Sequence, residues 1–176
     1  MDVVNPANES VIGKVPSCGE DELNRAVTAA RRAFKTWSKT SIDERRAVLH
    51  AIADAIEANH DQLFRLLTRE QGKPHAQAEM EIGGAPANIR AQATLEFQDV
   101  INEDSENRLS RTRRVPVGVV GGIVPWNFPV LMAVQKIAPA LLSGCTIVLK
   151  PSPFTPLTTL LIAELIADKV PAGVLN

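Results

Sequence analysis

The sequence lacks several features that would assign the protein to a particular structural or cellular class. Only two of its 176 residues are cysteines, Cys18 and Cys145, so no disulfide framework is expected and a reducing compartment, the cytoplasm, is favoured. The apolar stretches are too short and too interrupted to cross a bilayer. The first residues, Met1 to Asn5, have neither the basic nor the apolar region of a secretory signal. The formal net charge of −1 provides no overall field that would attract nucleic acid or anionic lipid.

What is present is typical of a soluble globular protein. Hydrophobic residues make up 45% of the chain and charged residues 22%, which argues against disorder, collagen and coiled coil. The length fits one ordinary domain. Charged residues are dense up to about Arg114 and then become rare. Dense mixed charge is typical of solvated helix faces, whereas an apolar tract with few charges is typical of buried strands and helices.

The first 110 residues divide into an arm and a helical part. Residues 1–18 contain turn-forming residues between short apolar pieces, which predicts an extended arm or a short hairpin. Residues 19–110 are expected to be helical. Apolar stripes and caps indicate helices that begin near residues 20, 41 and 61. Residues 75–104 are also helical in composition, and the glycines and proline at 83–86 predict a kink or a split there.

The spacing of the apolar residues changes after residue 110. Residues 111–176 predict a strand, a helix, a second strand and a second helix, at 117–124, 130–143, 146–149 and 157–169. This order is typical of the first half of a nucleotide-binding α/β sheet. The expected fold class is therefore α/β: an N-terminal helical segment is followed by the first β-α-β-α half of a Rossmann-like dinucleotide-binding domain, incomplete, with the whole chain forming part of one domain.

Several short motifs resemble the aldehyde dehydrogenase superfamily. The most specific are PWNFP at 125–129, followed by Lys136, and SGCTIVLKPS at 143–152. Four further motifs fit the same pattern: TPLT at 155–158, EQGKP at 70–74, NPAN at 5–8 and PAGVLN at 171–176. The resemblance covers essentially the whole chain. It implies oxidation of an aldehyde to an acid with NAD or NADP, through a cysteine thiohemiacetal and hydride transfer to the nicotinamide.

The resemblance also implies roles for individual residues. Asn127 would donate a hydrogen bond to a developing oxyanion. Lys150 would contact the adenosine ribose of the cofactor, and Ser152 can donate to a phosphate oxygen. Many family members carry a glutamate three residues after this lysine, whereas this chain has Pro153, so we expect NADP to be tolerated without NAD being excluded. The residues expected to line the cofactor groove are Ile123, Val124, Pro125 and Trp126.

Ordinary structural interpretations stand beside these roles. Asn127 could be a turn residue that satisfies local backbone groups, and Lys150 could be a strand-end cation in water. Phe128 is expected in the core, while Trp126 is left open between the core and a pocket wall. Lys136 is a lone cation on an apolar helix and is expected to have a specific partner; the resemblance implies a place near the active site.

No residue of this chain is expected to be the nucleophile. Cys145 begins a buried strand, with no helix N-terminus or cation evident to activate its thiol, and the motif match puts it outside the family's catalytic position. The histidines show no metal-ligand spacing, so no metal site is expected. The four arginines within 108–114 lack interleaved aromatics, which favours a solvated strand face over a nucleic-acid site. The glycines at 118–122 do not form a dinucleotide fingerprint and are expected to permit close packing.

The chain is therefore expected to be the N-terminal, truncated portion of a longer oxidoreductase. It lacks the catalytic cysteine and the general base, so it is expected to be inactive alone. The alternative is a non-catalytic truncated paralogue that binds a nucleotide or a protein partner. Expected partners are an aldehyde in the complete enzyme and either a second copy or a full-length homologue. Neither nucleic acid nor a membrane is expected.

Overall fold

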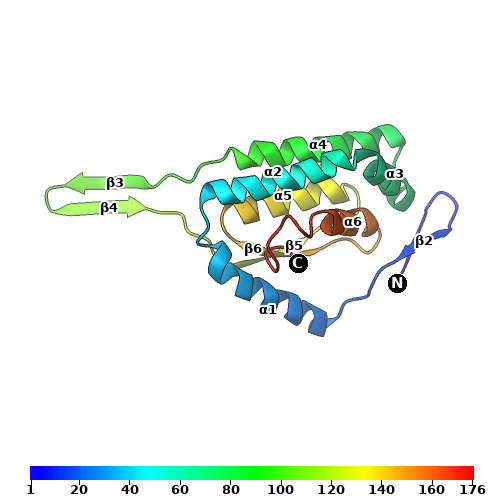
Figure 1. Cartoon of the computed structure of the whole chain (residues 1–176), viewed down its shortest axis with the longest axis horizontal. Coiled ribbons are helices and arrows are strands. Elements are labelled where there is room, and N and C mark those ends of the chain that lie inside the picture. The colour runs from blue at the N-terminus through cyan, green and yellow to red at the C-terminus, as the bar shows by residue number, and fades with distance from the viewer.

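A parallel pair of strands lies between helices, as the sequence predicted. In the computed structural model, which covers residues 1–176, β5 (Val119–Ile123) and β6 (Thr146–Lys150) pair in parallel. They are joined by α5 (Pro129–Leu142). Figure 1 shows α5 on one face of these strands and α1 (Glu20–Trp37) on the other. The β-α-β crossover therefore has the arrangement of a nucleotide-binding sheet.

A second layer of helices covers α5. It consists of α2 (Ile42–Ala58), α3 (His60–Gln71) and α4 (His75–Ala93), and α6 (Leu157–Leu165) packs beside α3 and α5 (Figure 1). The expected capping box of Ser41 opens α2, and Gly72 ends α3 in the left-handed conformation, with φ 86°. Buried side chains from these helices and from β6 form one continuous core.

The last residues of the chain extend the sheet. The amide of Ile147 donates to the carbonyl of Val174 at 2.9 Å, and the amide of Leu149 donates to the carbonyl of Asn176 at 2.7 Å. Leu175 pairs with Ile147 in parallel. A third parallel strand therefore begins beside β6, on the edge that β5 does not occupy.

The N-terminal arm is a hairpin, one of the two forms expected for residues 1–18. β1 (Asp2–Val4) and β2 (Val11–Lys14) pair antiparallel. The arm is held against the helices at two points. A Cβ on Gly13 would lie 2.9 Å from the Leu157 side chain, and a Cβ on Gly72 would lie 2.7 Å from the Pro6 ring.

The expectation of helix up to residue 104 is wrong beyond Ala93. Residues 100–112 form an antiparallel hairpin, β3 (Val100–Ser105) and β4 (Arg108–Thr112), which projects from the body in Figure 1. Glu106 and Asn107 make its two-residue turn, because Ser105 pairs with Arg108. Nearly every residue of the hairpin is exposed, so burial imposes no alternation of polar and apolar residues that would reveal the strands.

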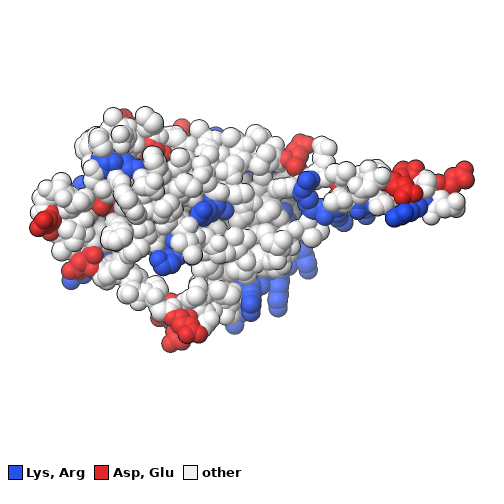
Figure 2. All heavy atoms as spheres, turned by 180° about the vertical axis from the view of Figure 1, so that it is seen from behind, with Lys and Arg blue, Asp and Glu red and all other residues white.

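The four arginines within 108–114 are exposed, as predicted, but they do not form one strand face. Arg108 and Arg111 lie on opposite faces of β4, and Arg113 and Arg114 follow its end. Arg108 pairs with Glu103 at 3.3 Å, and Arg111 and Arg113 lie 3.7 and 4.0 Å from the carboxylate of Asp99. Figure 2 shows charged side chains along the β3–β4 hairpin, while the broad face of the body beside the hairpin carries few. No helix is long and apolar enough to cross a membrane.

Of the kink or split expected at residues 83–86, the split does not occur. α4 runs unbroken from His75 to Ala93 with Pro86 inside it. Ala85, Pro86 and Ile89 are buried against neighbouring helices, while Gly83 and Gly84 face solvent. Tertiary packing therefore outweighs the poor helix propensity of this segment.

Candidate functional site

The two segments that carry the predicted site leave the sheet at the same edge. Because β5 and β6 are parallel, Ile123 lies opposite Lys150 in the register. The amide of Val124 donates to the carbonyl of Lys150 at 3.1 Å. The hydroxyl of Thr155 contacts the carbonyl of Trp126 at 3.4 Å. The carboxyl edge of a parallel sheet is where open α/β folds bind ligands. All of the predicted site residues lie in the two segments that leave the sheet at this edge.

The predicted cofactor residues differ in exposure. Ile123 is 76% exposed and Trp126 53% exposed, and Pro125 and Lys150 are also exposed. The Lys150 ammonium makes no ion pair and one hydrogen bond, 3.4 Å from the carbonyl of Pro151. Two other residues are buried: Val124 points into the core, and Ser152 accepts a hydrogen bond from the amide of Phe154 at 3.3 Å.

Asn127 presents an unused amide at this edge. Its side chain is exposed and makes no hydrogen bond within the chain, whereas its backbone carbonyl accepts one from Lys73 Nζ at 2.8 Å. The interpretation that the side chain satisfies local backbone groups is therefore not supported. Phe128, the next residue, is the N-cap of α5, so the amide stands just ahead of the helix.

A buried ion pair lies beneath this loop and was missed in the sequence. Lys73 follows the end of α3, Glu81 lies on α4, and their side chains are 5% and 0% exposed. One carboxylate oxygen of Glu81 accepts from the ammonium of Lys73. The other accepts from the amides of Val130 and Leu131 at 2.9 and 3.1 Å. Glu81 therefore caps the N-terminus of α5 from another part of the chain.

Glu70 caps α6 in the same manner. Its carboxylate accepts from the amides of Leu157 and Thr158 at 2.7 and 2.9 Å. Burial raises the pKa of the Glu70 carboxyl above its usual value, although the hydrogen bonds from Thr158 and Leu157 oppose this shift. The motif EQGKP thus supplies structural groups: Glu70 caps α6, Gly72 ends α3, and Lys73 reaches the PWNFP loop.

Among the nearby side chains, the expectation for Phe128 is corrected, and the expectation of a specific partner for Lys136 stays a prediction. Phe128 is not in the core: it is 46% exposed, and its ring lies 4.3 Å from the ammonium of Lys73. Lys136 has no hydrogen-bond or ion-pair partner within the chain, although its methylene stem lies beside Gly122. The close packing expected of the glycines at 118–122 is found only at Gly122, where an added Cβ would lie 2.8 Å from the Leu149 side chain. No atom lies within 4 Å of a Cβ added to Gly118 or Gly121, so close packing does not explain those two glycines.

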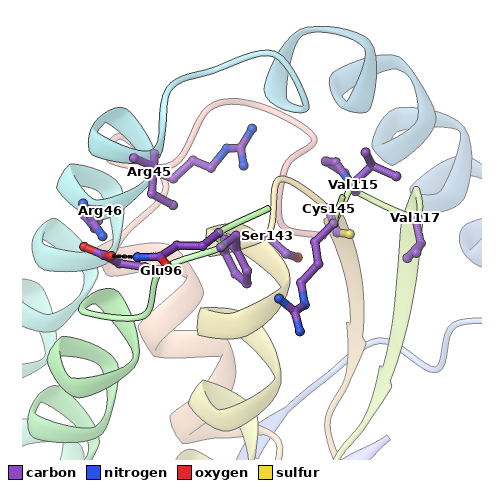
Figure 3. Close-up of a pocket in the computed structure, with 12 residues that line it drawn as sticks. Arg45, Arg46, Glu96, Val115, Val117, Ser143 and Cys145 are labelled. Atoms are coloured by element: carbon purple, nitrogen blue, oxygen red, sulfur yellow. Dashed lines mark hydrogen bonds between the residues drawn. The ribbon is translucent and has the colours of Figure 1, made fainter. Parts of the chain in front are cut away.

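Cys145 lies at the opposite end of β6 from Lys150. Five residues separate them, which corresponds to roughly 16 Å along a strand. Cys145 is 3% exposed and lines a cavity of about 640 Å³, shown in Figure 3 together with Arg45, Ser143 and Val117. The expectation that no cation lies near Cys145 is wrong, because Arg45 borders the same cavity.

The guanidinium of Arg45 is occupied by other partners. It donates to the carbonyls of Ser38, Thr40 and Leu142 at 3.0, 2.9 and 3.3 Å, and to the Thr40 hydroxyl at 3.0 Å. Burial lowers its pKa from the usual value, partly offset by Cys145. Arg45 therefore caps the C-terminus of α5 by binding the carbonyl of Leu142. No group of three or more metal-ligating side chains occurs in the chain.

Comparison with known proteins agrees with this geometry. The model of the aldehyde dehydrogenase family matches residues 1–176. The chain is 41% identical to the mitochondrial succinate-semialdehyde dehydrogenase of Arabidopsis thaliana, with 99% of this chain and 34% of that protein covered. It is 41% identical to the NADP(+) succinate-semialdehyde dehydrogenase GabD of Escherichia coli, with 100% and 37% covered.

Solved structures give the same result. A putative aldehyde dehydrogenase from Burkholderia cenocepacia superposes with a TM-score of 0.96 at 40% identity, with 100% of this chain and 37% of that chain covered. A point mutant of betaine aldehyde dehydrogenase from Staphylococcus aureus, in complex with NAD+, superposes with a TM-score of 0.93 at 36% identity, with 100% and 37% covered.

The chain belongs to the aldehyde dehydrogenase family. It corresponds to the N-terminal part of these proteins and spans between 34 and 37% of the length of the two curated relatives.

Proposed function

We propose that residues 1–176 form the N-terminal part of an NAD(P)-dependent enzyme that oxidises an aldehyde to a carboxylic acid. The observation that carries the proposal is the free amide of Asn127. It is exposed, has no partner within the chain, and stands beside the carboxyl edge of the sheet. A neutral donor in such a place stabilises negative charge that develops on a carbonyl oxygen.

The residues at the sheet edge fit a dinucleotide cofactor. Exposed apolar surface at Ile123 and Trp126 lies beside the exposed ammonium of Lys150. Lys150 would hold the adenosine ribose, Ser152 would donate a hydrogen bond from its hydroxyl to a phosphate oxygen, and Pro125 would complete the groove wall. The side chain of Val124 was expected in this wall, but it points into the core and does not line the groove. The cofactor supplies the hydride acceptor. Relatives include an enzyme named for NADP(+) and a structure with NAD+.

The preference between the two cofactors depends on position 153. Pro153 is exposed in the loop after β6, where many family members carry a glutamate. A carboxylate there accepts hydrogen bonds from ribose hydroxyls and repels a 2′-phosphate, and proline does neither. We infer that the complete enzyme tolerates NADP better than a glutamate-bearing relative does, while still accepting NAD.

The nucleophile and the general base lie outside residues 1–176 in this proposal. Cys145 is buried at the opposite edge of the sheet from Asn127. Cys18 lies in the loop ahead of α1. Without a thiolate near Asn127 no thiohemiacetal forms, so these residues alone do not oxidise aldehydes. Two free cysteines support a reducing compartment, the cytoplasm.

The partners follow from the same assignment. The complete enzyme takes an aldehyde as its small-molecule substrate, and the chain associates with itself or with a full-length homologue. Association is supported by the projecting hairpin, whose side chains Val100, Ile101 and Leu109 are 48, 62 and 63% exposed. A two-stranded hairpin without a partner is marginally stable in water.

The experiment is NAD(P)H formation with a panel of aldehydes. In the complete enzyme, Asn127→Ala should lower kcat about a hundredfold, whereas the control Asn24→Ala, an exposed amide on α1, should leave it unchanged. Residues 1–176 alone should give no turnover. Turnover of residues 1–176 that is abolished by Cys145→Ser and retained by Cys18→Ser would overturn the proposal. Nucleotide binding without turnover in the complete protein would favour the non-catalytic module.

A further inference from the structure

The loop that carries Asn127 has almost no hydrogen bonds of its own. Pro125 and Pro129 have no backbone N–H, and the amides of the three residues between them donate to no acceptor in the chain. The carbonyl of Phe128 accepts the first helical hydrogen bond of α5, from the amide of Met132 at 2.9 Å. The carbonyls of Trp126 and Asn127 accept only side-chain hydrogen bonds, the weak one from Thr155 at 3.4 Å and the one from Lys73 at 2.8 Å. The orientation of the Asn127 peptide therefore depends mainly on Lys73.

Lys73 is itself fixed on all sides. An ammonium has three donors: one is bonded to Glu81, a second to the carbonyl of Asn127, and the group lies 4.3 Å from the ring centroid of Phe128. The side chain is 5% exposed, so water does not compete. Glu81 in turn holds the amides of Val130 and Leu131. The two side chains therefore bind the loop and the first turn of α5 to α4 as one unit.

A buried ion pair gives little net stability compared with apolar residues of the same shape. The Lys73–Glu81 pair instead fixes the position of the PWNFP loop. A displacement of about 1 Å at a catalytic group can lower a rate about a hundredfold. Glu81 is fully buried and Lys73 nearly so, and neither side chain lies on the exposed side of the loop, where the free amide of Asn127 stands.

The geometry points to Lys73 and Glu81 as positioning residues that hold the Asn127 amide where the oxyanion of the substrate forms. This inference rests on the proposed function. It assigns the pair no contact with the substrate or the cofactor, so both act only through Asn127. Their replacement should lower kcat and leave the KM values for aldehyde and cofactor nearly unchanged, because oxyanion stabilisation belongs to the transition state.

The test is a double-mutant cycle in the complete enzyme. Lys73→Met should lower kcat about tenfold to a hundredfold when Asn127 is present, and less than twofold in the Asn127→Ala background. Because Lys73→Met leaves a buried carboxylate unpaired, which is strongly destabilising, the neutral pair Lys73→Met with Glu81→Gln is measured in the same two backgrounds. Folding of each variant is checked by its melting temperature.

Two controls separate positioning from general destabilisation. Glu70→Gln removes the charge of the other buried cap, which makes no hydrogen bond to the PWNFP loop, so its effect should multiply with that of Asn127→Ala. Lys39→Met, on an exposed lysine, should change neither kcat nor melting temperature. Multiplicative losses for Lys73→Met and Asn127→Ala would overturn the inference while leaving the proposed function intact. An unchanged kcat for Asn127→Ala alone would overturn the proposed function itself.

Discussion

Gly144 is a position where adding a single methyl group should cost much stability. It follows the C-cap of α5 with φ +82°, and a Cβ there would lie 2.6 Å from Cζ of Arg45 and 2.7 Å from both of its terminal nitrogens. In Gly144→Ala the left-handed backbone costs about 1–2 kcal/mol. The guanidinium must also move away from buried carbonyls.

The second contribution is set by the hydrogen bonds of Arg45. The guanidinium makes four, at 2.9 to 3.3 Å, and a hydrogen bond from a charged group is worth about 1.5–3 kcal/mol. Losing one of them brings the expected destabilisation to about 2.5–5 kcal/mol. In urea, with a slope of about 2 kcal/mol per molar, the midpoint should fall by about 2 M.

The assay is equilibrium unfolding followed by tryptophan fluorescence, with Gly84→Ala as the matched control. Gly84 lies on the exposed face of α4, and nothing lies within 4 Å of its added Cβ. Alanine there should therefore stabilise the protein by about 1 kcal/mol. The reasoning fails if Gly144→Ala is within about 1 kcal/mol of the unmodified protein, since Arg45 would then move without losing its partners.

Three further predictions concern charge and association. Burial raises the pKa of the Glu70 carboxyl above its usual 4.5, so ionisation of this carboxyl opposes folding. The free energy of unfolding of Glu70→Gln, relative to that of the unmodified protein, should therefore rise as pH increases above about 4.5. A difference between the two free energies that does not change with pH would contradict this. Pro153→Glu in the complete enzyme should raise the ratio of kcat/KM for NAD over NADP about ten- to a hundredfold, since one like charge near a 2′-phosphate is worth about 1–3 kcal/mol; an unchanged ratio would mean that position 153 does not face the ribose. Residues 1–176 should self-associate in light scattering, and Ile101→Lys with Leu109→Lys should reduce this; undiminished association would locate the contact elsewhere.

The sheet part could be predicted because its signals are local. Strand β5, the proline at the start of α5, strand β6 and the start of α6 follow from apolar runs and turn residues that lie next to one another. The arrangement of Ile123 and Lys150 at one edge then follows from parallel pairing alone. The free amide of Asn127 could be expected from its motif, although its lack of a local partner could not.

The buried carboxylates were missed because a charge within a helix normally indicates a solvated face. A more careful use of spacing would have found them. Glu81 lies on the same stripe as Ala78, Ile82 and Ala85, all of which are buried. Glu70 continues the buried stripe of Leu63 and Leu67. An acid on an apolar stripe requires a partner. Lys73 lies only 8 residues from Glu81, but the amides that Glu81 and Glu70 cap lie 49 to 88 residues away, and the sequence carries no local signal for those contacts.

The spacing of apolar residues and the density of charge change near residue 110, where the helical part ends and the sheet part begins. These two parts nevertheless do not form independent folding units. The ends of the helices in the sheet part are completed by the helical part: Glu81 holds the start of α5, Arg45 its end, and Glu70 the start of α6. The hydroxyl of Thr146 on β6 donates to the carbonyl of Ala30 on α1 at 3.1 Å. Buried helix ends without partners are costly, so residues 111–176 by themselves would leave these groups unsatisfied. The edge that presents Asn127 and Lys150 is therefore built by the sheet part and held in place by side chains of the helical part.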